Sequence, residues 1–169
     1  WGSSGSDVFA VGDTGTILHY NSTAWSAMTS GTTTILRSVW GSSGSDVFAV
    51  GNTGTILHYN SSTWSAMSSG TTNTLTSVWG SSGSDVFAVG YDGTIFHYDG
   101  STWSQMNSGT INGLYGVWGS SSSDVYAVGN GGTILHYDGN PSNTWTTMDS
   151  STTNMLHSVS GRSPSDIYA

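Results

Sequence analysis

Charged side chains are scarce in this chain of 169 residues. Lys and Arg together number two, Asp and Glu together number ten, and the formal net charge is −8. The sequence has no Lys and no Glu, and its only basic side chains besides His are Arg37 and Arg162. Nucleic acids and anionic membrane surfaces need Lys or Arg to neutralise phosphate, so neither is an expected partner.

Cysteine and long apolar runs are also missing. Without Cys the chain forms no disulfide and no thiolate metal site. No stretch of about 18 apolar residues is present, so we expect no membrane insertion. Gly, Ser and Thr dominate instead, and the helix-favouring residues Lys and Glu are lacking, which predicts an all-β chain.

A repeat organises the whole sequence. Near-identical segments reading WGSSGSDVFAVG or WGSSSSDVYAVG begin 39 residues apart, at Trp1, Trp40, Trp79 and Trp118. A fifth start, SGRSPSDIYA, comes at Ser160 after three extra residues in the loop YDGNPSNTW. We therefore predict one domain over 1–169, which is a single repeat array and a segment of a longer array or part of an oligomeric ring. Its repeats are 1–39, 40–78, 79–117, 118–159 and a partial 160–169.

Each repeat contains four short β-rich runs, here named a, b, c and d. Examples are LTSVW at 75–79 for a, DVFAVG at 46–51 for b, GTILHY at 54–59 for c and TWSAM at 63–67 for d, with a belonging to the following b. The turns are short enough for antiparallel hairpins, which disfavours a parallel β-solenoid. Run b is apolar on both faces, as in stacked sheets. The period and pattern predict a β-propeller of four-stranded antiparallel blades, about four repeats plus a partial fifth.

The repeat W-G-S-x-x-x-D-V-[FY]-A-V-G, followed by G-T-I-[LF]-H-Y, resembles the tandem repeats of secreted bacterial propeller proteins that lack an assigned activity. More distantly it resembles the photosystem II assembly factor and sialidase-type propellers. This resemblance implies a propeller fold and an extracellular or cell-surface location. The sialidase Asp-box has the order S-x-D-x-G-x-T-W, from which YDGSTW at 98–103 departs in spacing.

Histidine and aspartate recur once in each repeat. Strand c carries His19, His58, His97 and His136, and strand b begins at Asp7, Asp46, Asp85, Asp124 and Asp166. Strand c lies third from the propeller axis, so the histidines cannot converge on a metal ion. We expect each to be half-buried and bonded to a polar neighbour. Each Asp should fix the a–b turn by accepting backbone N–H bonds, the alternative being an Asp–His–Ser–Trp network like that of WD repeats.

Two tryptophans also recur in each repeat. Strand a ends at Trp1, Trp40, Trp79 and Trp118, and strand d contains Trp25, Trp64, Trp103 and Trp145. Trp can stack on sugars, but repetition of both sets favours packing between blades, with the outer set more open.

Catalysis is disfavoured because equivalent blades supply copies of one group rather than groups in unequal roles. With no Glu, Lys or Cys and two Arg, few members of a glycosidase site are available. We expect no enzyme activity, no catalytic residue, no metal and no cofactor.

The copies differ at several positions, and two sets are among the most chemically varied. The b–c turn carries Asp13, Asn52, Tyr91 and Asn130, and strand a carries Arg37, Thr76, Tyr115 and His157. In a propeller both sets surround one mouth of the central channel, so these eight residues are the candidate ligand-binding set.

The sequence therefore predicts a non-catalytic extracellular binding or adhesion module for a glycan or a protein, using the face of b–c turns and d–a loops. A structural fibre, stalk or surface layer is one alternative, and a glycan-active propeller enzyme is another. Open blade edges also make self-association possible.

Overall fold

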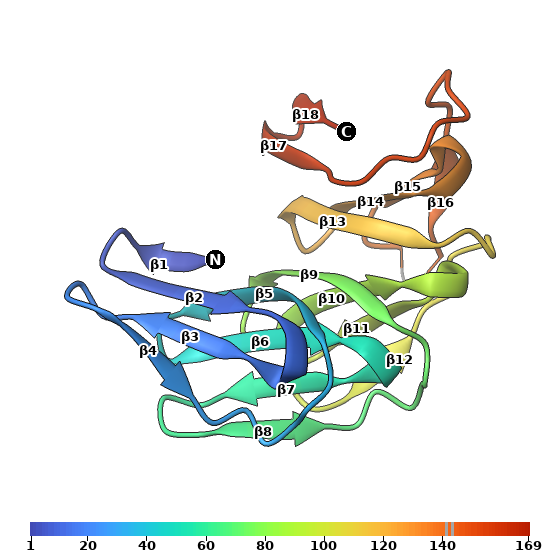
Figure 1. The fold of residues 1–169 in the computed structure, drawn as a ribbon. Helices are drawn as coiled ribbons and strands as arrows, with labels where there is room; N and C mark the ends of the chain where they lie inside the picture. The colour runs from blue at the N-terminus through green and yellow to red at the C-terminus, as the bar shows by residue number, and fades with distance from the viewer. Residues whose placement is uncertain (141, 143) are drawn as a thin grey trace.

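The computed structural model describes residues 1–140, 142 and 144–169 and forms four complete antiparallel sheets followed by a two-stranded one (Figure 1). The extra loop residues of the fourth repeat include Pro141 and Asn143, which lie outside the described residues. Each complete sheet is one blade, and its strands neighbour each other in chain order as a meander.

The strand bounds show the repeat directly. Blade one holds β1 (Gly2–Ser4), β2 (Asp7–Val11), β3 (Ile17–Tyr20) and β4 (Trp25–Met28). Blade two holds β5 (Leu36–Ser43), β6 (Asp46–Gly51), β7 (Ile56–Tyr59) and β8 (Trp64–Met67). Blade three holds β9 (Leu75–Ser82), β10 (Asp85–Gly90), β11 (Ile95–Tyr98) and β12 (Trp103–Gln105). Blade four holds β13 (Leu114–Ser121), β14 (Asp124–Gly129), β15 (Ile134–Tyr137) and β16 (Thr146–Met148), and the partial blade holds β17 (Ser160–Ser163) and β18 (Asp166–Tyr168).

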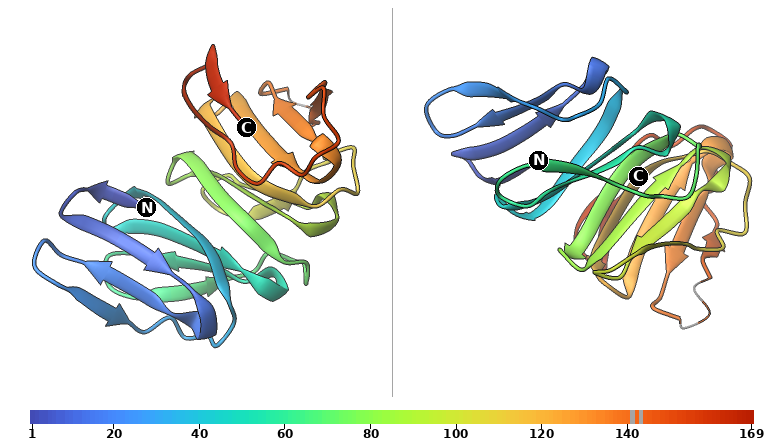
Figure 2. Two further views of the ribbon diagram at one scale, coloured as in Figure 1. Left: turned by 45° about the horizontal axis from the view of Figure 1, so that its top comes forward. Right: turned by 90° about the horizontal axis from the view of Figure 1, so that it is seen from below.

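The blades follow one another as a fan, with blade one at one end and the partial blade at the other (Figure 2). The first strands β5, β9 and β13 lie side by side, and β17 lies against β13. The predicted all-β propeller architecture, with strand a belonging to the blade of the following b, is confirmed.

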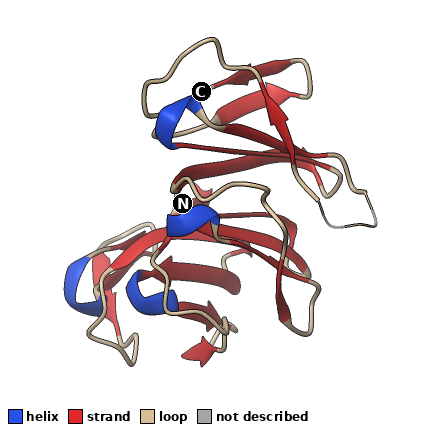
Figure 3. Ribbon diagram, turned by 90° about the vertical axis from the view of Figure 1, so that its right-hand side faces the viewer, coloured by secondary structure: helices blue, strands red, loops and turns tan. Residues whose placement is uncertain are grey.

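Within the described residues, helix is confined to one short 3-10 turn in each b–c connection (Figure 3). These turns are η1 (Asp13–Gly15), η2 (Asn52–Gly54), η3 (Tyr91–Gly93) and η4 (Asn130–Gly132). In the described part of the chain, no helix has the length and apolar character needed to cross a bilayer.

The expected bounds of strands a and c need correction. Strand β5 continues to Ser43, so the a–b turn is shorter than the GSSGS segment suggested, and an irregularity between Gly41 and Ser43 lets the strand run on. Strand c begins later than expected, at Ile56, because Asn52–Gly54 forms the 3-10 turn. Thr53 there has a φ of 54°, a conformation that sequence pattern alone does not reveal.

Close contact between blades explains the Trp-Gly pair that opens each repeat. A Cβ placed on Gly41 would lie 2.8 Å from the Trp1 ring, and one on Gly80 would lie 2.7 Å from the Trp40 ring. Glycine is therefore required where the tryptophan of the preceding blade approaches the backbone. The inner tryptophans pack between blades as predicted.

The core consists of three apolar clusters, one at each seam between complete blades. Within the first seam, Trp64 meets Phe9 edge to face with ring centres 6.2 Å apart. Trp103 meets Phe48 and Trp145 meets Phe87 in the same way. The packing role expected of the outer tryptophans holds for these three, whereas Trp25 on blade one is 50% exposed.

Candidate functional site

A Ser–Asp–His network closes the a–b end of each complete blade, which we call the Asp end. In blade two, His58 Nε2 donates to Asp46 Oδ1 at 2.6 Å, and the Ser42 hydroxyl donates to Asp46 Oδ2. The equivalent His–Asp distances are 2.6 Å for His19–Asp7, 2.6 Å for His97–Asp85 and 2.8 Å for His136–Asp124. The serines in those blades are Ser3, Ser81 and Ser120.

The expectation for the histidines is confirmed, since each is about three-quarters buried and bonded to a carboxylate. The histidine ring also stacks on the aromatic side chain of strand b, as His58 does on Phe48 at 4.4 Å. The expectation that Asp fixes the turn through backbone N–H bonds is wrong. The carboxylate instead joins strand a to strand c through two side chains, which is close to the alternative network.

The electrostatics of the Asp end follow from these bonds. Hydrogen bonds from Ser3 and then from His19 hold the pKa of the Asp7 carboxyl below its ordinary value of 3.8. Burial raises the pKa of Asp124, but bonds from Ser120 and His136 outweigh it and the pKa is lowered overall.

The Asp end is not arranged for nucleophilic catalysis. A catalytic triad places His between Ser and Asp so that the ring can remove the serine proton. Here Asp lies between Ser and His, so the ring does not face the hydroxyl. Among the described residues no three His, Cys, Asp or Glu side chains gather closely enough to hold a metal ion.

The varied residues lie at the opposite end of the blades, which we call the mouth. In blade two, Arg37 Nε donates to Asn52 Oδ1 at 2.6 Å. In blade four, Asn130 Nδ2 donates to the Tyr115 hydroxyl at 3.3 Å. These pairs join strand a to the b–c turn of the same blade.

Aromatic rings extend this arrangement across the blades. The Tyr115 ring lies 6.0 Å from the Tyr91 ring at 71° and 6.0 Å from the His157 ring at 42°. Tyr91 belongs to η3 of blade three, and His157 precedes β17. Tyr115 is thus the centre of an aromatic row that spans blade three, blade four and the start of the partial blade.

Two members of the predicted set stand apart from this row. The Thr76 hydroxyl lies 2.6 Å from the Leu114 carbonyl oxygen and 3.0 Å from that of Val89, so it bonds backbone rather than facing the mouth. Asp13 lies exposed on η1 of blade one, whereas the aromatic row begins at blade three. The structure therefore brings together Tyr91, Tyr115, Asn130 and His157, and separately Arg37 and Asn52.

A cavity of about 320 Å³ adjoins the aromatic row. It is lined by Tyr91, Asp92, Ile111, Asn112, Gly113, Tyr115 and Asn130. Ile111 is 87% exposed and comes from the d–a loop, while Asn112 donates to Thr133 Oγ1 at 2.8 Å. Sequence reasoning missed both, although Ile111 replaces Thr33 and Thr72 of the first two repeats and so carried a visible signal.

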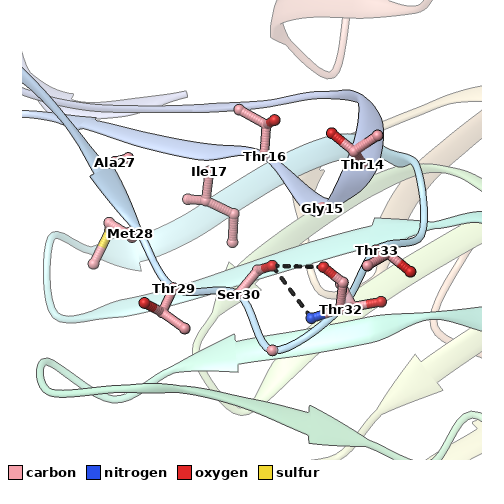
Figure 4. A pocket seen from close by; sticks show the side chains of 11 residues that line it. Thr14, Gly15, Thr16, Ile17, Ala27, Met28, Thr29, Ser30, Thr32 and Thr33 are labelled. Atoms are coloured by element: carbon pink, nitrogen blue, oxygen red, sulfur yellow. Dashed lines mark hydrogen bonds between the residues drawn. The ribbon is translucent and has the colours of Figure 1, made fainter.

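A larger groove of about 720 Å³ lies in blade one between the b–c turn and the d–a loop (Figure 4). Ser30 there bonds to the backbone of Thr32, and a Cβ on Gly15 would lie 2.0 Å from the Thr32 carbonyl oxygen. Similar grooves occur in blades two and three at equivalent residues. These grooves are lined largely by Gly, Ser and Thr residues that recur in the repeats, so we interpret them as the places where the d–a loop packs against the b–c turn. The cavity beside Tyr91 and Tyr115, whose lining residues differ among the repeats, is the candidate site.

The fold is similar to that of solved propellers. The structure titled "YCF48 bound to D1 peptide" matches with a TM-score of 0.70 and 16% identity, covering 94% of this chain and 54% of that chain. YCF48 from Cyanidioschyzon merolae matches with a TM-score of 0.68 and 15% identity, covering 94% and 59%. This chain thus spans somewhat over half the length of these two proteins. No protein-family model and no curated protein matches it.

Proposed function

We propose that this chain is a non-catalytic binding module that holds a peptide segment of a protein partner at the mouth. The aromatic row around Tyr115 and its adjoining cavity carry the proposal. The row combines apolar ring surface with the Asn112 and Asn130 amides, the mixture found in sites that fix a ligand by shape and by a few polar bonds.

The geometry of the rings favours a peptide over a glycan. Tyr91 and Tyr115 meet edge to face at 71°, so they form the walls of a cavity rather than one flat platform for a sugar ring. The solved propeller titled as bound to D1 peptide lends support, because a related fold there binds a peptide.

Charge narrows the class of peptide. The formal net charge is −8, and Asp92 lines the cavity beside the two tyrosines. A cationic side chain would gain from the carboxylate and from the tyrosine faces. We therefore propose a partner segment that presents apolar and basic side chains, in an extracellular or cell-surface setting.

The test is a peptide-display selection on the immobilised chain, followed by calorimetric titration of the selected peptides. We expect peptides with apolar and basic side chains, and Tyr115→Ala should weaken their binding at least about tenfold, as for a central aromatic contact. Tyr168→Ala is the matched control, since Tyr168 is 69% exposed and lies on β18 outside the mouth.

Failure to select any such peptide, or equal losses for Tyr115→Ala and Tyr168→Ala, would contradict the proposal. If the chain instead bound glycans on an array, and Tyr115→Ala weakened that binding, a glycan would be the ligand rather than a peptide. Filaments of the native protein in electron micrographs, without peptide binding, would favour the structural alternative.

A further inference from the structure

The cavity at the mouth combines residue types that no other repeat brings together. The b–c turn of blade three supplies Tyr91 and Asp92, the following d–a loop supplies Ile111, and β13 supplies Tyr115. The same four positions read Asp, Thr, Thr and Arg one junction before blade three's turn is reached from blade one, and Asn, Thr, Thr and Thr from blade two. Two aromatic rings, a carboxylate and an aliphatic side chain therefore gather at a single junction between blades.

The two tyrosines give this cavity the shape of a corner. Their ring centres lie 6.0 Å apart, their planes meet at 71°, and both residues line the cavity. A flat guanidinium group stacks on the face of one ring, whereas a rounded group can touch both walls of a corner. The volume of about 320 Å³ is close to the lower limit of ligand cavities, roughly 300 Å³, so the corner suits a small rounded group.

The charges around this corner favour a cation. The faces of aromatic rings are the negative part of their charge distribution. Asp92 is exposed, and the ion pairs among the described residues are all His–Asp pairs at the Asp end, so none of them engages its carboxylate. Neither Arg37 nor Arg162 lines the cavity. A ligand must therefore bring the positive charge itself.

The kind of cation follows from what the walls can offer it. A primary ammonium group has three N–H donors, and each needs an acceptor once water is displaced. The tyrosine faces and the aliphatic Ile111 side chain attract charge or methyl groups but accept no conventional hydrogen bond. A quaternary ammonium group has no N–H donor and is covered by methyl groups, so it contacts such walls with little loss of hydration, as in known aromatic cages.

We propose that the corner formed by Tyr91 and Tyr115, with Asp92 beside it, binds a quaternary ammonium group. On the proposed function, on which this assignment rests, the group is the head of a trimethylated lysine side chain in the bound peptide. Such a side chain unites the positive charge and the apolar surface that the mouth favours.

The first test uses choline as the probe, with 3,3-dimethylbutan-1-ol as the matched control because it has the same shape without the charge. Tyrosine ring resonances of the whole chain, followed by nuclear magnetic resonance during titration, report binding of either compound. We expect choline to bind at least about tenfold more tightly, as for a largely desolvated cation–π contact. Absence of choline binding, or equal affinity for the uncharged compound, would overturn the site.

The other repeats supply variants that fit the fold. Tyr115→Arg copies Arg37 at the equivalent position and should weaken choline binding at least about tenfold, because it replaces a wall of the corner by a like charge. Asp92→Thr copies Thr53, which has the same left-handed backbone with a φ of 54° against 56° at Asp92. It should weaken binding about threefold, as for loss of an exposed charge. Tyr168→Ala lies outside the mouth and should have no effect, whereas choline binding that survives Tyr115→Arg would contradict the assignment.

A second experiment identifies the carrier of the group. A selected peptide made with trimethyllysine in place of lysine should bind at least about tenfold more tightly than the lysine form. Co-sedimentation of the chain with phosphatidylcholine vesicles would instead assign the group to a lipid and overturn the peptide carrier. Peptide binding that depends on Tyr115 but gains nothing from trimethylation would overturn the quaternary ammonium site and leave the proposed function standing. Choline binding without any selected peptide would do the reverse.

Discussion

The two ends of the blades differ in which side chains the repeats keep and in which contacts cross from blade to blade. At the Asp end, each network closes within one blade, between residues 12 positions apart such as His58 and Asp46, and the same three residue types recur in four blades. At the mouth, the hydrogen bonds also stay within one blade, but aromatic contacts such as Tyr91–Tyr115 run from blade to blade, and the residues differ among the repeats. The repeats keep the same residue types at the Asp end, where these side chains hold the strands of a blade together. Their residue types vary at the mouth, where the side chains of several blades come together.

The largest effect expected from this contrast comes from two substitutions within blade three. Asp85→Ala leaves His97 and Ser81 without their acceptor and should lower the free energy of unfolding by about 2 kcal/mol, as for a lost bond to a charged group. Tyr91→Ala at the mouth should change it by no more than about 0.5 kcal/mol. Urea unfolding followed by tryptophan fluorescence measures both, and equal losses would break the contrast.

The second effect is acid sensitivity of the Asp end. The folded-state pKa of Asp7 lies below the ordinary value of 3.8 because Ser3 and His19 bond the carboxylate. The unfolded chain therefore takes up the proton first as pH falls. The stabilisation is fully present well above pH 3.8 and is lost as pH falls below that value through the folded-state pKa.

Thermal unfolding of the wild type and Asp7→Asn across this acid range checks the sign. The variant should be less stable near neutral pH and lose less stability on acidification. Ser3→Ala keeps the carboxylate but removes the first donor, so its behaviour should fall between the two. A steeper acid loss in Asp7→Asn would show that the bonds do not favour the ionised form.

The sequence predicted the antiparallel sheets, but not the hydrogen-bond partners of the aspartate carboxylates. The 39-residue period and the short turns suffice for antiparallel blades, because these signals are local. The Asp46–His58 bond depends on the pairing of Phe48 with His58 and on the irregularity at Gly41–Ser43, which only the assembled sheet fixes. At the mouth, comparison of the copies located Tyr91 and Tyr115. It could not show that Thr76 at the equivalent strand position turns to the backbone.

The smallest effect tests Thr76, which belongs to the varied set but bonds like a structural residue. Its hydroxyl hydrogen is donated to one acceptor at a time, and the Leu114 carbonyl oxygen at 2.6 Å is closer than that of Val89 at 3.0 Å. This bond joins blade three to blade four. Thr76→Val keeps the side-chain shape and should cost about 1 kcal/mol of unfolding free energy without altering affinity for the selected peptides. Thr76→Ser keeps the hydroxyl and should recover most of that loss. Reduced peptide affinity in Thr76→Val at unchanged stability would instead place Thr76 with the residues of the mouth.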